Sequence, residues 1–244
     1  PWDLSRKRDG LFLLPPFNSD NSSMRRSRMD SLISILPFIE STDDEFVIMT
    51  DCNVVCSMDY SELIDFHLKS CADVTICCKR GCRPELQDIM TFETDENGRV
   101  EKLAISPKLL SECLYSLNII LMRKSVLERL IAEAVSLNYT KFTRDILQRN
   151  VDTLNIYAYE YKGFSRTIDS LKSYYDISLE LLDRENRKQL FRGDRPVYTK
   201  VRDDMPAIYG INCKATNSLI ADGCHIEGEV ENCILFRGAR VGKN

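Results

Sequence analysis

Basic side chains near the N-terminus are the first residues of this sequence whose chemistry suggests a ligand. Arg25, Arg26 and Arg28 lie close together, and Lys7 and Arg8 precede them. Guanidinium groups recognise phosphate esters through paired hydrogen bonds, so the cluster is a candidate phosphate-binding site. Short basic runs are also common on solvated surface loops, and the sequence favours that second interpretation.

Cysteine and histidine are the residues that a metal site would use. The chain has ten cysteines but no C-x-x-C pair, the nearest to that pattern being Cys52 with Cys56 and Cys78 with Cys82. Only His67 and His225 could complete a zinc site. Several cysteines stand in apolar runs such as VTICCK and ENCILF, where small buried side chains belong. We therefore expect reduced, packed thiols and no structural metal.

Composition limits the class of protein. With 244 residues, 43% of them hydrophobic, the chain can bury a sizeable core. Its net charge of -4 is spread along the sequence, which argues against a nucleic-acid partner. No apolar stretch approaches the roughly 20 residues that span a bilayer, and no leader pattern precedes the first helix. We expect a cytoplasmic protein, of which this chain is an excerpt, since it starts at Pro1 and stops inside a repeat.

Apolar spacing predicts strands and helices in alternation. The predicted helices are 29–39, 59–70 with Asp59 as N-cap and Glu62 three residues on, 125–135 with a Ser125–Glu128 capping box, 143–148 and 170–183. The predicted strands are 46–50, 74–79, 89–93, 100–104, 115–122 and 154–161, the third and fourth joined by the turn DENG. This order predicts an α/β fold with a mostly parallel, doubly wound sheet.

A different pattern begins near residue 206. Apolar residues recur at six-residue steps, in the series Ile220–Ile226, Cys224–Val230–Phe236 and Leu235–Val241, with single glycines at the turns. That spacing is typical of a left-handed parallel β-helix, the alternative being an ordinary hairpin edge. Such a stack needs several coils, so we expect only its first coils here.

Specific segments resemble a known family. RPVYTKVRDDMPAIYG followed by NSLIADGCHIEGEVENCILFRGARVGK is similar to the link and first coils of glucose-1-phosphate adenylyltransferases (ADP-glucose pyrophosphorylases). LPPFN, MDY, VEK, SLNIILM, FTRDI and GFSRTIDSLKSYYDISLELL match that family in the same order. The resemblance, nearest to the D-type subunit of glycogen synthesis, implies a nucleotidyltransferase-like mixed sheet in 1–190 without its N-terminal part. It implies a linker and truncated β-helix in 191–244.

The family's chemistry needs a divalent cation. Attack of glucose-1-phosphate on ATP expels pyrophosphate, and active members use Mg²⁺ held by two aspartates. The resemblance places Asn53 and Thr167 at those two positions, so we expect no cofactor in this chain. Asp51 and Asp169 lie two residues away as fallback acids, but that shift would lose the matching MDY and GF anchors.

Some other ligand-binding features of the family are absent from this sequence, and others are present. The ten glycines form no G-x-G cluster for a phosphate loop, and MRRSRMDSL stands where the family has GTADA. The resemblance implies a sugar-binding role for four residues, although a Glu-Lys pair is also an ordinary surface feature. These are Glu101, Lys102, Ser116 and Asp145. It also connects Arg25, Arg26 and Arg28 with a phosphorylated-metabolite effector.

The resemblance leaves two functions open. The favoured one is a non-catalytic, regulatory subunit that joins a catalytic adenylyltransferase homologue in a hetero-oligomer, expected to be a tetramer. The alternative is an active adenylyltransferase that makes ADP-glucose with Asp51 or Asp169 as metal ligand. A β-helix acyltransferase with His225 as base is disfavoured, because such an enzyme would not need the upstream matches.

Overall fold

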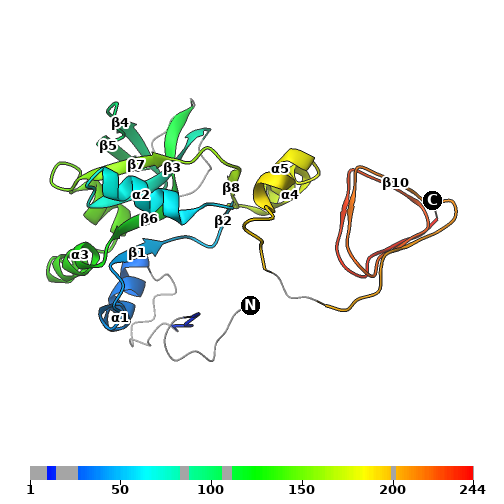
Figure 1. The fold of residues 1–244 in the computed structure, drawn as a ribbon, viewed down its shortest axis with the longest axis horizontal. Helices are drawn as coiled ribbons and strands as arrows, with labels where there is room; N and C mark the ends of the chain where they lie inside the picture. The colour runs from blue at the N-terminus through cyan, green and yellow to red at the C-terminus, as the bar shows by residue number, and fades with distance from the viewer. Residues whose placement is uncertain (1–9, 15–26, 83–87, 106–111, 199–201, 244) are drawn as a thin grey trace. The chain divides into compact units, whose positions relative to one another are not determined.

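The computed structural model describes residues 10–14, 27–82, 88–105, 112–198 and 202–243. The chain forms two compact units (Figure 1), the first Pro1–Val54 with Asp59–Lys162 and the second Val55–Met58 with Gly163–Asn244. The domain limits predicted from the sequence, 1–190 and 191–244, stay a prediction. None of the helices within the described ranges is long and apolar enough to cross a membrane.

A six-stranded mixed sheet forms the centre of the first unit (Figure 1). Its order is β5-β4-β6-β3-β7, and β1 also pairs with β6. The strands are β1 (Phe46–Met49), β3 (Val74–Gly81), β4 (Met90–Thr94), β5 (Val100–Ile105), β6 (Cys113–Arg123) and β7 (Ile156–Glu160). The mixed α/β fold is confirmed.

The direction of the strands differs from the prediction. Among the described strands of this sheet only β3 and β7 run parallel, whereas β6 runs antiparallel to β1, β3 and β4, and β4 runs antiparallel to β5. The expectation of a mostly parallel sheet is therefore wrong. The long central strand β6 sets the direction, because it follows the β4–β5 hairpin and not a crossover helix.

Helices of the first unit begin where short-range signals place them, with one exception. The elements are α1 (Arg28–Glu40), α2 (Tyr60–Lys69), α3 (Lys124–Ser136) and a π-helix, η1 (Phe142–Gln148). Asp59 caps α2 by accepting a hydrogen bond from the Ser61 N–H, as predicted. Glu62 accepts instead from the Tyr159 hydroxyl at 3.2 Å. Burial, followed by the Glu62 charge, raises the pKa of Tyr159 to about 12.

The predicted Ser125–Glu128 capping box is wrong. Helix α3 starts at Lys124 directly after β6, so Ser125 already lies in its first turn, and Arg123 is an N-cap without a side-chain bond. The Lys124 ammonium instead donates to the carbonyls of Glu40 (3.1 Å) and Thr42 (2.6 Å) at the end of α1. Lys124 thus connects the start of α3 to the end of α1.

The apolar core of the first unit lies between the sheet and its helices. On α3 the buried residues follow one helical face, namely Leu127, Leu130, Ile131 and Ala134. They join β-strand residues such as Ile76, Ile120 and Ile156 in a single cluster. Each fully buried leucine or isoleucine contributes about 1.5–3 kcal/mol relative to exposure. This core fixes the strands from which the site residues project.

The β4–β5 turn covers the outer edge of β7. Asp95 supports the turn by accepting hydrogen bonds from the N–H groups of Asn97 (2.9 Å) and Arg99 (2.8 Å). Gly98, at φ 84°, accepts from the Ala158 N–H of β7 at 2.8 Å. A Cβ at Gly98 would stand 3.2 Å from the Ala158 carbonyl oxygen, so the close approach favours glycine.

The second unit begins with a strand pair and two short helices. β2 (Val54–Cys56) pairs with β8 (Ser165–Thr167), and α4 (Leu171–Glu180) and α5 (Arg184–Leu190) follow. Ser170 caps α4, and the Arg187 guanidinium donates to the carbonyls of Leu181 and Leu182 at 2.6 Å just after α4 ends. These polar contacts join the two helices to each other.

Residues 202–243 form triangular coils (Figure 1). Three sides carry parallel strand pairs, β15-β12-β9, β10-β13 and β11-β14. The strands are β9 (Ile208–Tyr209), β10 (Lys214–Thr216), β11 (Leu219–Ile220), β12 (His225–Ile226), β13 (Glu229–Glu231), β14 (Ile234–Leu235) and β15 (Arg240–Val241). Because all these pairs are parallel, the hairpin alternative is excluded for this segment.

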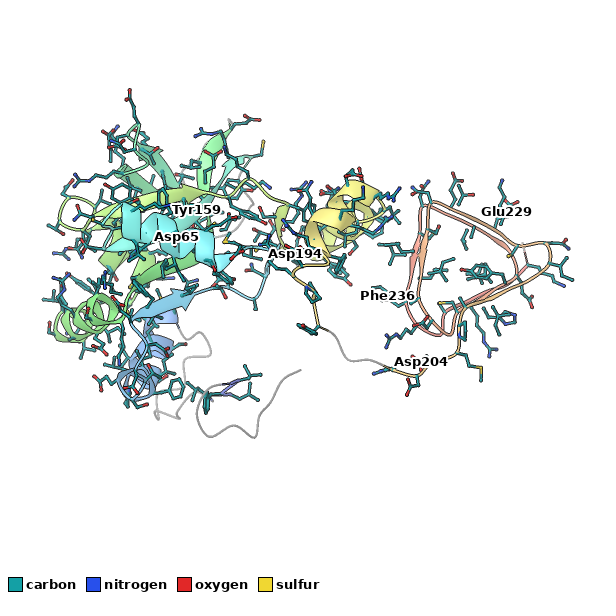
Figure 2. All side chains as sticks on the ribbon, viewed as in Figure 1. Asp65, Tyr159, Asp194, Asp204, Glu229 and Phe236 are labelled. Atoms are coloured by element: carbon teal, nitrogen blue, oxygen red, sulfur yellow. The ribbon has the colours of Figure 1, made fainter. Side chains whose placement is uncertain are left out.

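The interior of the coils is narrow and apolar. Cys224, Ile226 and Val230 are its buried residues, and Leu235 packs against them. Phe236, the last member of a six-residue series, is 66% exposed (Figure 2), so that series does not follow the buried interior to its end. Paired strands such as Leu219–Ile220 and Ile234–Leu235 lie 15 residues apart, so the three sides of that coil average five residues and not six.

Candidate functional site

The loop after β1 carries Asn53, the first of the two positions predicted to match the family's metal aspartates. Asn53 is half-buried and stands directly before β2. Asp51, two residues earlier, forms an ion pair with the guanidinium of Arg28, the first residue of α1. The fallback acid of this loop is therefore already bound to a side-chain cation.

The second position predicted to match a metal aspartate, Thr167, is at the end of β8. Thr167 is half-buried and closes that strand, in the second unit. Asp169 lies two residues further on, where its carboxylate accepts from the Ser170 hydroxyl at 3.0 Å. Its own N–H donates to the Ser173 hydroxyl, also at 3.0 Å. Asp169 thus contributes to the start of α4.

The residues at these positions do not fit a magnesium site. Mg²⁺ prefers carboxylate oxygens in octahedral geometry, whereas the two positions offer an amide and a hydroxyl, and Asp51 is paired with Arg28. No group of three or more His, Cys, Asp or Glu side chains in the described ranges is arranged to hold a metal ion. Neither predicted position therefore supplies a carboxylate of its own.

The β4–β5 edge holds the retained Glu-Lys pair. A bulge leaves Glu101 without a cross-strand partner between the pairs Glu93–Lys102 and Thr94–Val100, so Glu101 and Lys102 are both exposed. The Lys102 ammonium donates to Glu93 at 2.7 Å, and this bond is the main reason why its pKa is raised. The ammonium group of Lys102 is therefore bound to Glu93, a neighbour in the same sheet.

An open cavity of about 750 Å³ adjoins this edge. Its charged lining residues are Arg80, Glu93, Lys102 and Glu112. Sequence reasoning identified only Lys102 among them. Arg80 and Glu93 had no separate signal, because charged residues at strand ends are ordinary surface features until the pairing of the strands is known.

Ser116 is buried and serves the backbone of β6. Its hydroxyl accepts from the Asn118 N–H at 2.9 Å, where the β3–β6 pairing skips two residues between Ile119 and Ser116. Asn118 adopts φ 55°, a conformation that favours glycine and tolerates asparagine. Asparagine at position 118 therefore suits the backbone that this skip in the pairing requires.

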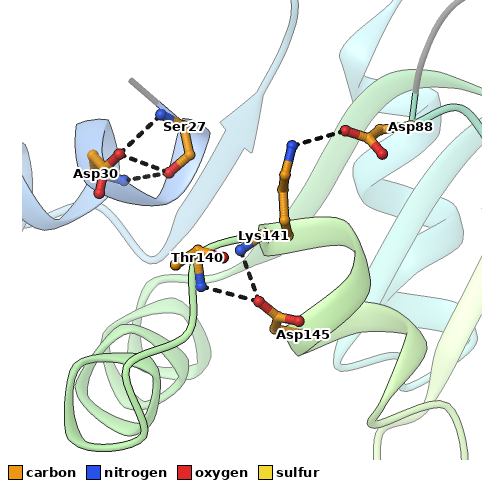
Figure 3. Close-up of polar contacts among 6 residues, drawn as sticks. All are labelled: Ser27, Asp30, Asp88, Thr140, Lys141 and Asp145. Atoms are coloured by element: carbon orange, nitrogen blue, oxygen red, sulfur yellow. Dashed lines mark hydrogen bonds and ion pairs between the residues drawn. The ribbon is translucent and has the colours of Figure 1, made fainter. Parts of the chain in front are cut away.

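Asp145 is held by the start of η1 (Figure 3). Its carboxylate accepts from the N–H groups of Thr140 (3.0 Å) and Lys141 (2.8 Å). The Lys141 hydrogen bond is the main reason why the pKa of Asp145 is lowered. The side chain of Lys141 meanwhile pairs with Asp88 at 3.0 Å. The structure thus gives Asp145 a backbone-capping contact.

The predicted basic cluster is described only in part. Arg25 and Arg26 lie outside the described residues, and Arg28 is the member that the structure places, against Asp51. The side chains of Arg28 and Asp51 are 26% and 33% exposed. The pairing could not be read from the sequence, because the two residues belong to different elements.

The fold combines a mixed α/β unit with three-sided parallel coils. No protein-family model matches the chain. It is 30% identical over 242 residues to glycogen biosynthesis protein GlgD of Bacillus subtilis, covering 99% of this chain and 61% of that protein. Glucose-1-phosphate adenylyltransferases of Thermosipho melanesiensis and Pseudothermotoga lettingae are 29% and 30% identical, covering 100% of this chain and 60% and 59% of theirs.

The chain is therefore similar over nearly its whole length to GlgD and to glucose-1-phosphate adenylyltransferases, and the predicted resemblance is confirmed. It spans about three fifths of the length of these curated relatives.

Proposed function

We propose that this chain belongs to a non-catalytic, regulatory subunit that acts in glycogen biosynthesis. The observation that carries the proposal is the donor set at the two family metal positions. Asn53 and Thr167 supply no carboxylate, and Asp51 is engaged by Arg28. Without a cation the negative charge that develops during phosphoryl transfer lacks its main stabilisation.

The contacts of the predicted sugar-binding residues also support the loss of catalysis. Lys102 is bonded to Glu93, Ser116 to the backbone of β6, and Asp145 to the backbone before η1. Each of these polar groups has a structural partner within the unit. Residual binding of glucose-1-phosphate would compete with the Lys102–Glu93 pair, which is highly exposed and therefore weak.

The coils support a role in assembly. We propose that they are the first turns of a left-handed β-helix and that this part joins the chain to a catalytic homologue, in a cytoplasmic hetero-tetramer. Exposed parallel coils of this kind extend by adding neighbours and offer a rigid surface. We propose a phosphorylated metabolite as effector at Arg25, Arg26 and Arg28, the last of which also pairs with Asp51.

The test is pyrophosphate release from ATP and glucose-1-phosphate with Mg²⁺, using the full-length protein alone and mixed with its catalytic homologue. We expect no turnover alone and an altered rate or effector response in the mixture. Turnover by the protein alone, abolished by Asp51→Asn or Asp169→Asn, would contradict the proposal and establish an active adenylyltransferase.

A further inference from the structure

The ion pair between Arg28 and Asp51 joins two segments at the loop after β1. Arg28 is the first residue of α1, and Asp51 follows the end of β1 by two residues. Neither side chain is fully solvated. The Arg28 Nη1 atom is buried and has no hydrogen-bond partner. The guanidinium is thus partly dehydrated, and Asp51 is its compensating anion.

The position of Arg28 makes this pairing necessary. The N-terminus of a helix carries a partial positive charge, so an arginine in its first turn is unfavourable unless an anion is near. Asp30 accepts from the Ser27 N–H and hydroxyl in the capping box, both at 2.9 Å. Asp51 is the acid that neutralises Arg28 itself.

The other end of α1 is also fixed by a cation. Lys124 donates to the carbonyls of Glu40 and Thr42, and its side chain is only 17% exposed. With both ends bound, α1 is held in place relative to β1 and α3. Arg28 therefore stays beside Asp51 instead of sampling the solvent.

We propose that Arg28 is a built-in cation that replaces the divalent metal ion at this loop. Its guanidinium neutralises Asp51, holds the loop in a metal-free arrangement and repels a second cation. The inference rests on the proposed function to the extent that the loop corresponds to the family's metal loop. Beyond that function, the inference identifies Arg28 as the residue that excludes the divalent ion.

The test is a Mn²⁺ titration of the full chain followed by electron paramagnetic resonance, in which free Mn²⁺ gives the signal. We expect no saturable site in the wild type that depends on Asp51. Arg28→Met removes the charge at similar length and is expected to tighten Mn²⁺ binding by roughly tenfold or more. Arg28→Met with Asp51→Asn is expected to lose that gain, and Arg28→Lys is expected not to show it.

Arg80→Met is the matched control. Arg80 also pairs with an acid, Glu160 at 3.6 Å, but 60% of its side chain is exposed and it lies on β3. We expect no new Mn²⁺ site in this variant. Circular dichroism of each variant reports folding. If Arg28→Met does not fold, comparison of the wild type with Asp51→Asn decides the question.

Two results would overturn the inference. One is an Asp51-dependent Mn²⁺ site in the wild type, and the other is a folded Arg28→Met variant with no Asp51-dependent gain. Both are read from ion binding and not from turnover. Catalytic activity of the wild-type protein would contradict the proposed function separately, so the two failures are distinguishable.

Discussion

Asp145 offers a direct test of the difference between a sugar-binding and a structural side chain. Asp145→Ala removes a carboxylate that accepts two backbone hydrogen bonds, from Thr140 and Lys141 (Figure 3). Loss of a comparable capping contact costs about 1–2 kcal/mol of unfolding free energy. For a chain of this size that corresponds to a fall in Tm of roughly 2–8 °C.

The pH dependence gives the same test a second readout. The pKa of Asp145 is lowered in the folded state, chiefly by the Lys141 N–H. A carboxyl group with a lowered pKa stabilises the fold above its ordinary pKa of about 4 and loses that contribution as the pH falls through its lowered value. The difference in Tm between wild type and Asp145→Ala should therefore be constant from about pH 5 to 8 and shrink below about pH 4.

The assay is differential scanning fluorimetry, with glucose-1-phosphate titrated in parallel. Asp145→Asn, which retains one oxygen acceptor, is expected to lose less stability than Asp145→Ala. Asp152→Ala, at an exposed aspartate of the following turn, is the control and should leave Tm almost unchanged. An unchanged Tm for Asp145→Ala together with lost glucose-1-phosphate binding would refute the capping interpretation.

Three further variants test other contacts. Burial, followed by the charge of Arg123, lowers the pKa of His67, and Asp73 opposes this shift. The fold is therefore most stable above about pH 6.5, where His67 is neutral, and becomes less stable as the pH falls. His67→Gln should flatten the dependence of Tm on pH below about pH 6.5. Lys124→Met should cost about 1–2 kcal/mol by freeing the carbonyls at the end of α1, measured by urea unfolding, and an unchanged midpoint would contradict that. Asn118→Val should cost roughly 1–2 kcal/mol in the same assay, whereas Asn118→Gly should be tolerated, because φ is 55°.

Local signals in the sequence predicted the local structure. Asp59 caps α2 as expected, and the turn DENG connects β4 and β5 because Asp95 and Gly98 supply the hydrogen bonds and the positive φ that it needs. The same reasoning failed at Ser125, where a capping pattern was present but β6 continued into α3 without a loop. A capping pattern in the sequence does not show whether a strand or a loop precedes the helix.

Features that depend on distant residues could not be predicted. The antiparallel direction of β6 follows from its pairing with three other strands. The Arg28–Asp51 ion pair joins a helix start to a strand end, and alignment alone presented Asp51 as an available acid. In the coils, Phe236 is exposed because paired strands repeat after 15 residues, an average of five for each side, so a fixed six-residue step goes out of phase.

The close approach of Gly98 to β7 has a consequence for self-association. An uncovered edge strand is a template on which another chain can add a strand, and β7 has such an edge on the side away from β3. The turn occupies part of that edge through the Gly98–Ala158 hydrogen bond and the Arg99–Tyr157 bridge. Polymerisation by strand addition at β7 would first have to displace the hairpin, so the turn protects the chain from this route of aggregation.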